Sequence, residues 1–295
     1  MHKYIIFDGE IINRNEFTIN ALSASAQFGL SPFEGIRVYE NINGKFNIIE
    51  LDDHLSRLSK SCDQLSIECD IDRNRIVQDI GKLLKANNVK GDTAFRIIAF
   101  VQEEASWQKA NLRATVAIAG VDKKYIDFDE RKILNLQTTH KTERASAKSF
   151  PFQVKVGANY LNSRYAHLEA LDSNFDGAIL CDAEEYITEN GGANVVIIKE
   201  QKLFAPCSMV NILEGITLNL LSQIAENIGL SVVRSKIHRS FLMDYDEAFI
   251  CGSAVEIHPI YINNKITNHN VSRELFAEYF KNLRDKSNIV RKTTI

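Results

Sequence analysis

The chain has 295 residues, of which 45% are hydrophobic and 25% are charged. This length exceeds the roughly 100–200 residues of one ordinary domain, and the composition supports a large buried core, which excludes a disordered or fibrous protein. The 35 basic and 38 acidic residues give a net charge of −3, which offers no electrostatic attraction to nucleic acid or to an anionic membrane surface.

The chain is expected to be cytoplasmic and to hold neither a metal nor a disulfide framework. The first apolar run breaks at Asp8, too early for a signal peptide, and no uncharged apolar run approaches the ~20 residues of a membrane span. The seven histidines show no paired ligand spacing. The cysteines are scattered, odd in number and without a CxxC pair, which is typical of reduced and mostly buried thiols. They are Cys62, Cys69, Cys181, Cys207 and Cys251.

Residues 1–120 are predicted to form a small α+β domain. Two hairpin turn signals, Asp8-Gly9 and Asn43-Gly44, predict strand pairs at 4–7 with 10–12 and at 36–39 with 46–49. Apolar residues at helical spacing predict a helix capped by Asp52 or Asp53 and a second helix that ends near Asn87. Their stripes consist of Leu55, Leu58, Cys62 and Leu65, and of Ile76, Ile80, Leu83 and Leu84. Two further strands are predicted at 93–101 and 114–119.

A charged stretch without periodicity, residues 121–131, is interpreted as a linker to a larger domain at 132–295. Short strands and tight turns in that domain indicate a barrel-like sheet. The strands are expected at 133–139, 153–156, 178–181, 185–188, 194–198 and 202–204. Helices are expected at about 163–173 and about 217–228, with Gly229 at the following position that favours left-handed backbone.

Two segments of the second half carry candidate catalytic groups. Lys155 lies on an alternating segment that leads into small residues, which allow a ligand or another backbone to approach closely. A desolvated lysine there can form a Schiff base, whereas a strand lysine is more often a solvated surface residue. Glu189 precedes Gly191-Gly192, and it is either exposed beside a hairpin or positioned to keep a pyridine ring protonated.

Other segments carry candidate anion-binding groups. The stretch from Leu213 to Thr217 opens a helix with free N–H groups, a glycine and a hydroxyl, which suits an anion; a plain cap by Thr217 is the alternative. The turn at Ser253 can add donors. Arg57 suits a phosphate contact or extends to the surface. Arg96 lies in a strand too apolar to face water freely, so it requires a structural acid or a substrate carboxylate as its partner.

In this order, the segments resemble the fold-type IV pyridoxal-phosphate enzymes, and most closely the branched-chain amino acid aminotransferases. The resemblance covers residues 5–262, and its most specific parts are Phe33-Glu34-Gly35-Ile36-Arg37 and Lys155 with Asn159-Tyr160. It implies an α+β, two-domain architecture with a small α/β N-terminal domain and a larger pseudo-barrel C-terminal domain. It also implies pyridoxal 5'-phosphate as cofactor and a homodimer or higher homo-oligomer.

The resemblance assigns a role to each candidate residue. Lys155 would form the Schiff base and move the proton. Tyr160 would bind the phenolic oxygen of the cofactor, Glu189 its pyridine nitrogen, and Leu213 would pack on its ring. The phosphate would be bound by Arg57, Ile216, Thr217 and Ser253. The substrate would meet Ala254 through its α-carboxylate, Arg96 through the second carboxylate of glutamate, and a side-chain pocket lined by Phe33, Gly35 and Tyr125.

These roles describe a transaminase that moves the amino group of a branched-chain or other hydrophobic L-amino acid to a 2-oxo acid such as 2-oxoglutarate. Two departures concern the substrate. Ala94 stands where branched-chain members have a tyrosine, and residues 101–110 hold Glu103, Glu104 and Trp107 in place of a small loop. The alternatives are D-amino acid or (R)-amine transaminases, an aminodeoxychorismate lyase-like enzyme, and a non-catalytic protein that kept the fold.

Overall fold

The computed structural model describes residues 1–284 and 289–295, and the chain divides into two compact units. Unit 1 comprises residues 1–125, 154–158 and 290–295, and unit 2 comprises residues 126–153 and 159–289. The first crossing falls inside the expected linker 121–131. The chain then returns twice to unit 1, which the continuous boundaries 1–120 and 132–295 did not include. Lys155 therefore belongs to unit 1 and not to the larger C-terminal part.

Unit 1 is built on an eight-stranded sheet with the order β16-β4-β3-β6-β7-β1-β2, in which β5 pairs with β7. The strands are β1 Tyr4–Phe7, β2 Glu10–Asn13, β3 Phe33–Glu40, β4 Phe46–Ile49, β5 Ile67–Cys69, β6 Thr93–Phe100, β7 Leu112–Asp122 and β16 Lys292–Thr294. Both predicted hairpins are confirmed, and Asp8 and Gly9 have the positive φ angles, 51° and 81°, of a tight turn. Strand β16 was not predicted, and it completes the sheet edge beside β4.

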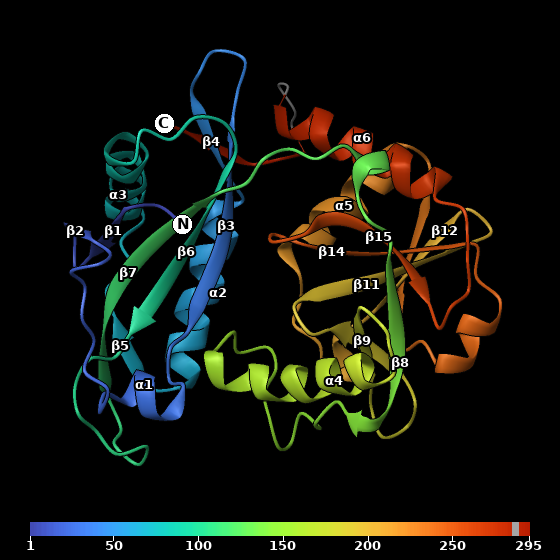
Figure 1. The fold of residues 1–295 in the computed structure, drawn as a ribbon, viewed down its shortest axis with the longest axis horizontal. Helices are drawn as coiled ribbons and strands as arrows, with labels where there is room; N and C mark the ends of the chain where they lie inside the picture. Colours follow the sequence, from blue (N-terminus) through green and yellow to red (C-terminus); the bar gives the residue numbers. More distant parts are fainter. Residues whose placement is uncertain (285–288) are drawn as a thin grey trace. The chain divides into compact units, whose positions relative to one another are not determined.

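Helices α2 (Leu51–Gln64) and α3 (Arg73–Ala86) pack against this sheet and share one apolar core with it (Figure 1). Both predicted stripes are confirmed as the packed faces of these helices. The predicted cap of α2 is wrong. The helix begins at Leu51, after Glu50 in left-handed backbone, and no side chain caps it. The Glu50 carboxylate instead accepts a hydrogen bond of 2.7 Å from Arg291 Nε. A short helix, α1 (Ala24–Phe28), precedes β3.

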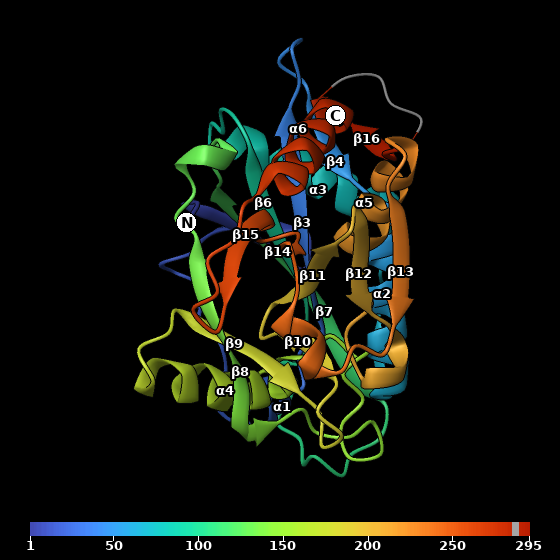
Figure 2. The same ribbon diagram turned by 90° about the vertical axis from the view of Figure 1, so that its right-hand side faces the viewer.

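Unit 2 contains a closed sheet, because the order β10-β9-β8-β15-β14-β11 ends with β11 paired back to β10 (Figure 2). Strands β12 and β13 extend from β11. The bounds are β8 Leu134–Glu143, β9 Gly177–Cys181, β10 Ile187–Asn190, β11 Ala193–Lys199, β12 Lys202–Pro206, β13 Ser231–Ser235, β14 Glu247–Gly252 and β15 Glu256–Ile262. The predicted barrel-like sheet is confirmed. Buried apolar residues such as Val195, Ile197 and Ile250 form its core.

Three helices surround this barrel. Helix α4 (Tyr160–Asp172) packs on β8 and β9, while α5 (Ile216–Asn227) and α6 (Asn270–Arg284) pack on each other and on β14. Gly229 follows α5 with a φ of 85°, as predicted, and α4 begins three residues before its predicted start. Helix α6 was not predicted. Its N-terminal Val271 and Ser272 N–H groups both donate to the Glu247 carboxylate at 2.9 Å. Among the described residues, no helix is both long enough and apolar enough to span a membrane.

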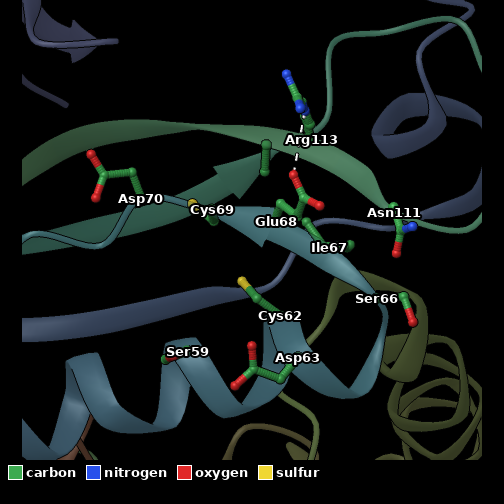
Figure 3. A pocket seen from close by; sticks show the side chains of 11 residues that line it. Ser59, Cys62, Asp63, Ser66, Ile67, Glu68, Cys69, Asp70, Asn111 and Arg113 are labelled. Carbon is green, nitrogen blue, oxygen red and sulfur yellow. Dashed lines mark ion pairs between the residues drawn. The ribbon is translucent and has the colours of Figure 1, made fainter.

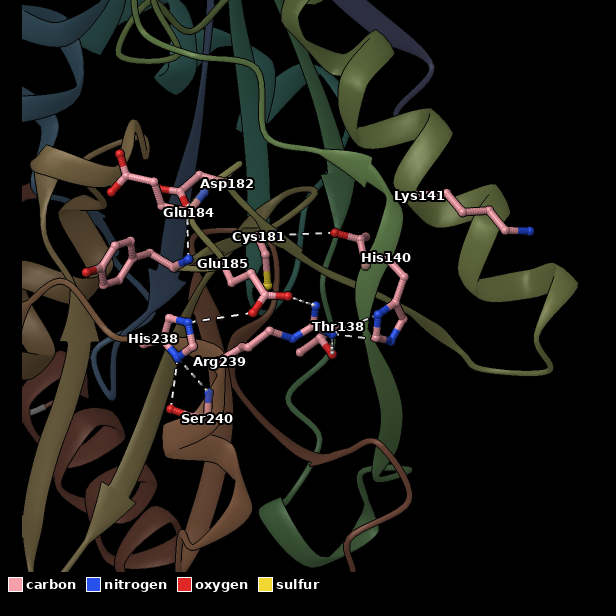
Figure 4. Close-up of polar contacts among 12 residues, drawn as sticks. Thr138, His140, Lys141, Cys181, Asp182, Glu184, Glu185, His238, Arg239 and Ser240 are labelled. Atoms are coloured by element: carbon pink, nitrogen blue, oxygen red, sulfur yellow. Dashed lines mark hydrogen bonds and ion pairs between the residues drawn. The ribbon is translucent and has the colours of Figure 1, made fainter.

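Polar contacts fasten the short helix η4 (Arg239–Met243) to the strands of the barrel (Figure 4). The Arg239 guanidinium donates to Glu185 Oε1 at 3.0 Å, to Thr138 Oγ1 at 3.3 Å and to His140 Nδ1 at 2.9 Å. Its backbone N–H also donates to the Glu185 carbonyl at 2.9 Å. Since these acceptors come from β8 and from the turn before β10, the arginine joins three segments of unit 2.

Candidate active site

Lys155 lies on an irregular segment of unit 1. Its N–H donates to Ser61 Oγ of α2 at 3.1 Å, and its carbonyl accepts from the Phe33 N–H at 3.0 Å. The predicted strand 153–156 is wrong, because these bonds replace a regular ladder and leave only a single bridge between Pro32 and Val156. The alternation of burial is nevertheless present, with Val154 and Val156 buried and Lys155 half-buried. The segment is thus fixed to both β3 and α2.

The Phe33 ring brings two cationic side chains of unit 1 together. Lys155 Nζ lies 5.0 Å from its centroid, and Arg96 Cζ, from the neighbouring strand β6, lies 4.5 Å from it. The expectation that Arg96 cannot face water is wrong, since its side chain is exposed, and no carboxylate of the described residues pairs with it. Gly35 is opposite Arg96 in the β3–β6 register, and a Cβ atom at Gly35 would meet nothing within 4 Å. This face of β3 therefore offers an aromatic surface, open space and two positive charges.

The opposite side of β3 holds a buried ionic cluster. The fully buried Glu34 carboxylate accepts from Arg57 Nε at 2.7 Å, from Arg57 Nη2 at 2.8 Å and bonds to His54 Nδ1 at 2.7 Å. Burial alone would raise the pKa of Glu34, but the hydrogen bonds from Arg57 and then from His54 lower it to about 2. Arg57 therefore does not extend freely to the surface, because two of its nitrogens are fixed by this carboxylate.

Glu189, on β10 of unit 2, is held by two partners. Its Oε2 accepts from the Leu213 N–H at 2.9 Å, and its Oε1 accepts from Arg144 Nη2. The alternative of an exposed glutamate is wrong, since only 12% of this side chain is accessible. Arg144 is buried, donates from Nε to the Asn211 carbonyl at 3.0 Å, and lies with its Cζ 3.3 Å from the Phe152 ring centroid. Its Nη1 has no hydrogen-bond partner among the described residues.

The start of α5 has the properties of an anion site. Gly215 is its N-cap and offers no side chain, so the alternative of a cap by Thr217 is wrong. Thr217 is the second residue of the helix and is buried. A Cβ atom at Gly215 would lie 1.8 Å from Asn194 Oδ1, which makes glycine a packing requirement at this position. The first N–H groups of α5 consequently carry no side-chain cap and can donate to a ligand.

Two turns of unit 2 lie side by side near these residues. Ser253 and Ala254 form the turn between β14 and β15, and Gly252, which precedes them, would place a Cβ atom 3.6 Å from the Gly192 carbonyl of the β10–β11 turn. Strand β11 leads from that turn to Asn194, which contacts the start of α5. The Ser253 turn, the Glu189 hairpin and the α5 start are thereby connected through one end of the barrel.

The remaining predicted residues take separate places. Tyr160 is the half-buried first residue of α4, and Leu213 is half-buried between Glu189 and α5. Tyr125 is the last residue of the first segment of unit 1 and is 45% exposed.

The substrate-side departures also have structural partners. Glu103 pairs with Lys109 and accepts from the Arg113 N–H at 3.1 Å, while Glu104 accepts from Asn20 at 2.9 Å. Trp107 is exposed. The two acidic side chains of this loop are therefore fixed to neighbouring parts of unit 1.

A family model for the class IV amino-transferases matches residues 31–261, which is more than half of the sequence. The chain belongs to the class IV aminotransferase family. This aminotransferase is 30% identical over 291 residues to a protein of Aquifex aeolicus (strain VF5) named as a probable branched-chain-amino-acid aminotransferase, with 96% of this chain and 93% of that protein covered.

Two solved structures extend the comparison. The branched-chain aminotransferase of Thermoproteus uzoniensis with norvaline has a TM-score of 0.87 at 27% identity and covers 95% of this chain and 94% of that chain. A second branched-chain amino acid aminotransferase, from the organism abbreviated T.th., is complexed with N-(5'-phosphopyridoxyl)-L-glutamate. It has a TM-score of 0.85 at 27% identity, with the same coverage.

The described residues of this aminotransferase fit pyridoxal phosphate, the cofactor of its class. An uncapped helix N-terminus suits the phosphate, and Glu189, fixed but still partly accessible, suits a pyridine nitrogen. No group of three or more His, Cys, Asp or Glu side chains within the described residues can hold a metal ion.

Sequence reasoning missed Arg144. It lies in a hydrophilic stretch with no periodicity, and nothing in its neighbours distinguishes it from Lys141 or Lys148. Its burial and its contact with Glu189 arise only when β8 and β10 are assembled.

Proposed function

We propose that this aminotransferase moves the amino group of a branched-chain or other hydrophobic L-amino acid to a 2-oxo acid such as 2-oxoglutarate. The observation that supports this substrate range is the Phe33 ring, flanked by Lys155 at 5.0 Å and Arg96 at 4.5 Å. An apolar surface beside an amine suits an aliphatic side chain, and a guanidinium suits the second carboxylate of a dicarboxylic acid. Norvaline and a glutamate adduct in the two solved relatives agree with both halves of this range.

When bound, pyridoxal phosphate supplies an electron-withdrawing ring that stabilises negative charge at the substrate α-carbon. Lys155 would hold it covalently as a Schiff base. Tyr160 would donate to its phenolic oxygen, Glu189 would keep its pyridine nitrogen protonated, and Leu213 would pack on the ring. Its phosphate would be bound by Arg57, by the N–H groups of Ile216 and Thr217, and by the hydroxyls of Thr217 and Ser253.

Lys155 would also move the proton. Its neutral amine accepts the α-proton of the amino acid and later returns it, so one residue acts as general base and general acid. The Ala254 N–H would bind the substrate α-carboxylate, and Phe33, Gly35 and Tyr125 would surround the side chain and orient the α-carbon toward the amine. Since the donor and the acceptor would use the same residues in turn, ping-pong kinetics are expected.

Substitution of Lys155 tests the catalytic assignment. Lys155→Ala should lose the borohydride-reducible link to the cofactor, and turnover should fall by at least about 10³-fold because no general base remains. Lys148→Ala, at an exposed lysine, is the matched control and should keep both properties. A Lys155→Ala variant that retains a reducible link would contradict the assignment.

An amino-donor screen tests the substrate range. L- and D-amino acids and simple amines are offered with 2-oxoglutarate or pyruvate as acceptor, and L-leucine, L-isoleucine or L-valine with 2-oxoglutarate should react fastest. Faster reaction of D-amino acids or (R)-amines, or release of pyruvate from aminodeoxychorismate without an acceptor, would replace the proposal by the corresponding activity. Arg96→Ala should weaken glutamate far more than leucine, and equal losses would assign Arg96 a structural role.

We also propose a homodimer located in the cytoplasm. Light scattering of the purified enzyme should give at least twice the 33.4 kDa of one chain. Fractionation of producing cells should recover the activity with the cytoplasmic proteins. A monomeric active enzyme would contradict the first part and leave the chemistry in place.

A further inference from the structure

Two cysteines of unit 1 line one cavity of about 740 Å³ (Figure 3). Cys62 lies in the last turns of α2, and Cys69 is the last residue of β5, the short strand that follows this helix. In Figure 3 the Cys62 sulfur points away from the helix toward the strand that carries Cys69. The two side chains are hydrogen-bonded to each other. All five cysteines are free thiols in the structure, so this pair is in the reduced state.

The two thiols differ in accessibility and in acidity. Cys62 is buried at 2% exposure, whereas Cys69 is half-buried at the cavity wall. The hydrogen bond from Cys62 lowers the pKa of Cys69, against burial and the nearby Asp70 carboxylate, and the same bond raises the pKa of Cys62. The more accessible sulfur is therefore also the better nucleophile, since the thiolate is the reactive form.

Polar and charged side chains form the rest of the cavity wall. The acidic ones are Asp63, Glu68 and Asp70, and Glu68 pairs with Arg113 at 3.3 Å. An anionic oxidant would be repelled by this set, whereas a small neutral peroxide is not.

We propose that Cys62 and Cys69 form an oxidative modification site that takes a small neutral hydroperoxide and closes into a disulfide. The Cys69 sulfur attacks one peroxide oxygen, so an S–O bond forms, the O–O bond breaks, and an alcohol, or water from hydrogen peroxide, leaves with the thiol proton. The Cys62 sulfur then attacks the Cys69 sulfur, an S–S bond forms, the S–O bond breaks, and hydroxide leaves with the Cys62 proton as water. The two thiols lose two electrons in total, and the peroxide gains them.

The other three cysteines lack this arrangement. Cys181 and Cys251 are buried in unit 2, where burial raises their pKa values to about 11 and about 12. Cys207 is half-buried without a thiol neighbour in the described part of the chain. These three residues are built-in controls within the same molecule.

The sequence makes the test direct, because trypsin releases both cysteines in one peptide, residues 61–73. The reduced holoenzyme is treated with hydrogen peroxide, denatured, blocked with N-ethylmaleimide and digested. Peptide 61–73 should lose two hydrogens and take up no maleimide, while the peptides with Cys181, Cys207 and Cys251 stay labelled. The loss at 61–73 should be at least about tenfold faster than at Cys207, because each unit of pKa changes the thiolate population about tenfold.

Single variants test the order of the two steps. In Cys62→Ser, Cys69 should accumulate a sulfenic acid that dimedone traps, and in Cys69→Ser peptide 61–73 should stay reduced. Cys207→Ser is the matched control and should oxidise like the parent. Thermal melts verify that each variant is folded, and the unsubstituted protein tests the pair without any substitution. Full maleimide labelling of peptide 61–73 after peroxide, or dimedone trapping at Cys62, would overturn the proposal.

Discussion

Each unit of this enzyme holds one arginine–carboxylate pair at its candidate site, and the two pairs are built in opposite senses. In unit 1 the carboxylate of Glu34 is fully buried, while 16% of the Arg57 side chain is accessible. In unit 2 the arginine, Arg144, is 1% accessible, and 12% of the Glu189 side chain is accessible. In both pairs the more accessible member is the one that the sequence assigned to the cofactor. The buried member positions it.

The difference shows that a charged site requires two kinds of residue. The group that faces a ligand can be recognised by its chemistry, while its anchor must be buried and fully hydrogen-bonded to repay the loss of hydration. Glu34 meets this condition through three hydrogen bonds, and Arg144 through Glu189, Asn211 and the Phe152 ring. Removing an anchor should therefore disturb both folding and the orientation of its partner.

The largest effect is expected for Glu34→Gln. It keeps the side-chain volume but leaves Arg57 as an uncompensated charge, so the free energy of unfolding should fall by about 3 kcal/mol in denaturant titrations. The matched control is Glu68→Gln, which breaks the exposed ion pair with Arg113 and should cost less than about 1 kcal/mol. Equal losses in the two variants would show that the buried cluster does not anchor unit 1.

Cofactor binding adds a second measurement to this variant. If Glu34 orients Arg57 toward the phosphate, Glu34→Gln should weaken pyridoxal phosphate by about tenfold and leave pyridoxal, which has no phosphate, nearly unchanged. Fluorescence titration of the apoenzyme gives both affinities. Parallel losses for the two compounds would assign the cluster to folding alone.

A smaller effect, with the opposite ligand pattern, is expected for Arg144→Met. Glu189 loses a charged hydrogen bond, so unfolding should become easier by about 2 kcal/mol. Because the pyridine ring is common to both compounds, pyridoxal phosphate and pyridoxal should weaken together. The control is Arg239→Met, in another polar cluster of unit 2, which should lower stability without changing either affinity. Loss of phosphate recognition alone in Arg144→Met would contradict the comparison.

Much of the fold could be read from the sequence where the signal was local. Asp8-Gly9 allowed the positive φ angles of its turn, and the apolar stripes of α2 and α3 matched the helical period. The strand expected at 153–156 failed because Lys155 bonds to a serine side chain and to Phe33, contacts that are remote in sequence. The β16 strand, at the other end of the chain from its partner β4, was missed for the same reason.

The candidate site was readable to the same extent. Glu34 and Arg57 both lie in segments that the sequence singled out, but their pairing spans 23 residues and depends on how α2 packs on β3. Arg144 gave no signal, because its neighbours are hydrophilic and its burial comes from the closure of the barrel. Assigned roles toward the cofactor stay predictions, and the anchors identified here give the means to test them.

The two units should also differ in their response to acid. The pKa of Glu34 is lowered from 4.5 to about 2, so its stabilisation is complete above pH 4.5 and is lost as the pH falls toward 2, about 3 kcal/mol in total. In unit 2, burial lowers the pKa values of His258 and His269 from 6.5. These histidines bind protons more tightly when unfolded, so their contribution is complete above pH 6.5 and is lost as the pH falls below it.

Hydrogen exchange followed by mass spectrometry between pH 7.5 and 4 measures this difference. Peptides of β15 and α6 should lose protection at a higher pH than peptides of β3 and α2, after correction for the intrinsic exchange rate. Earlier opening of β3 and α2 would contradict the assignment of the acid-sensitive groups.

The smallest effect is expected for His269→Phe. His269 is buried, its two ring nitrogens have no hydrogen-bond partner among the described residues, and it stacks on Tyr261 with a centroid distance of 5.6 Å. A phenylalanine keeps the ring contact and removes two unsatisfied polar atoms, so the protein should gain about 1 kcal/mol at pH 7. The gain should increase below pH 6.5, because the variant no longer binds a proton on unfolding. His258→Phe is the matched control: it loses the 2.8 Å bond to the Lys132 carbonyl and should destabilise. A destabilised His269→Phe would mean that the imidazole makes a necessary polar contact, and unit 2 would then rely on a third buried polar anchor.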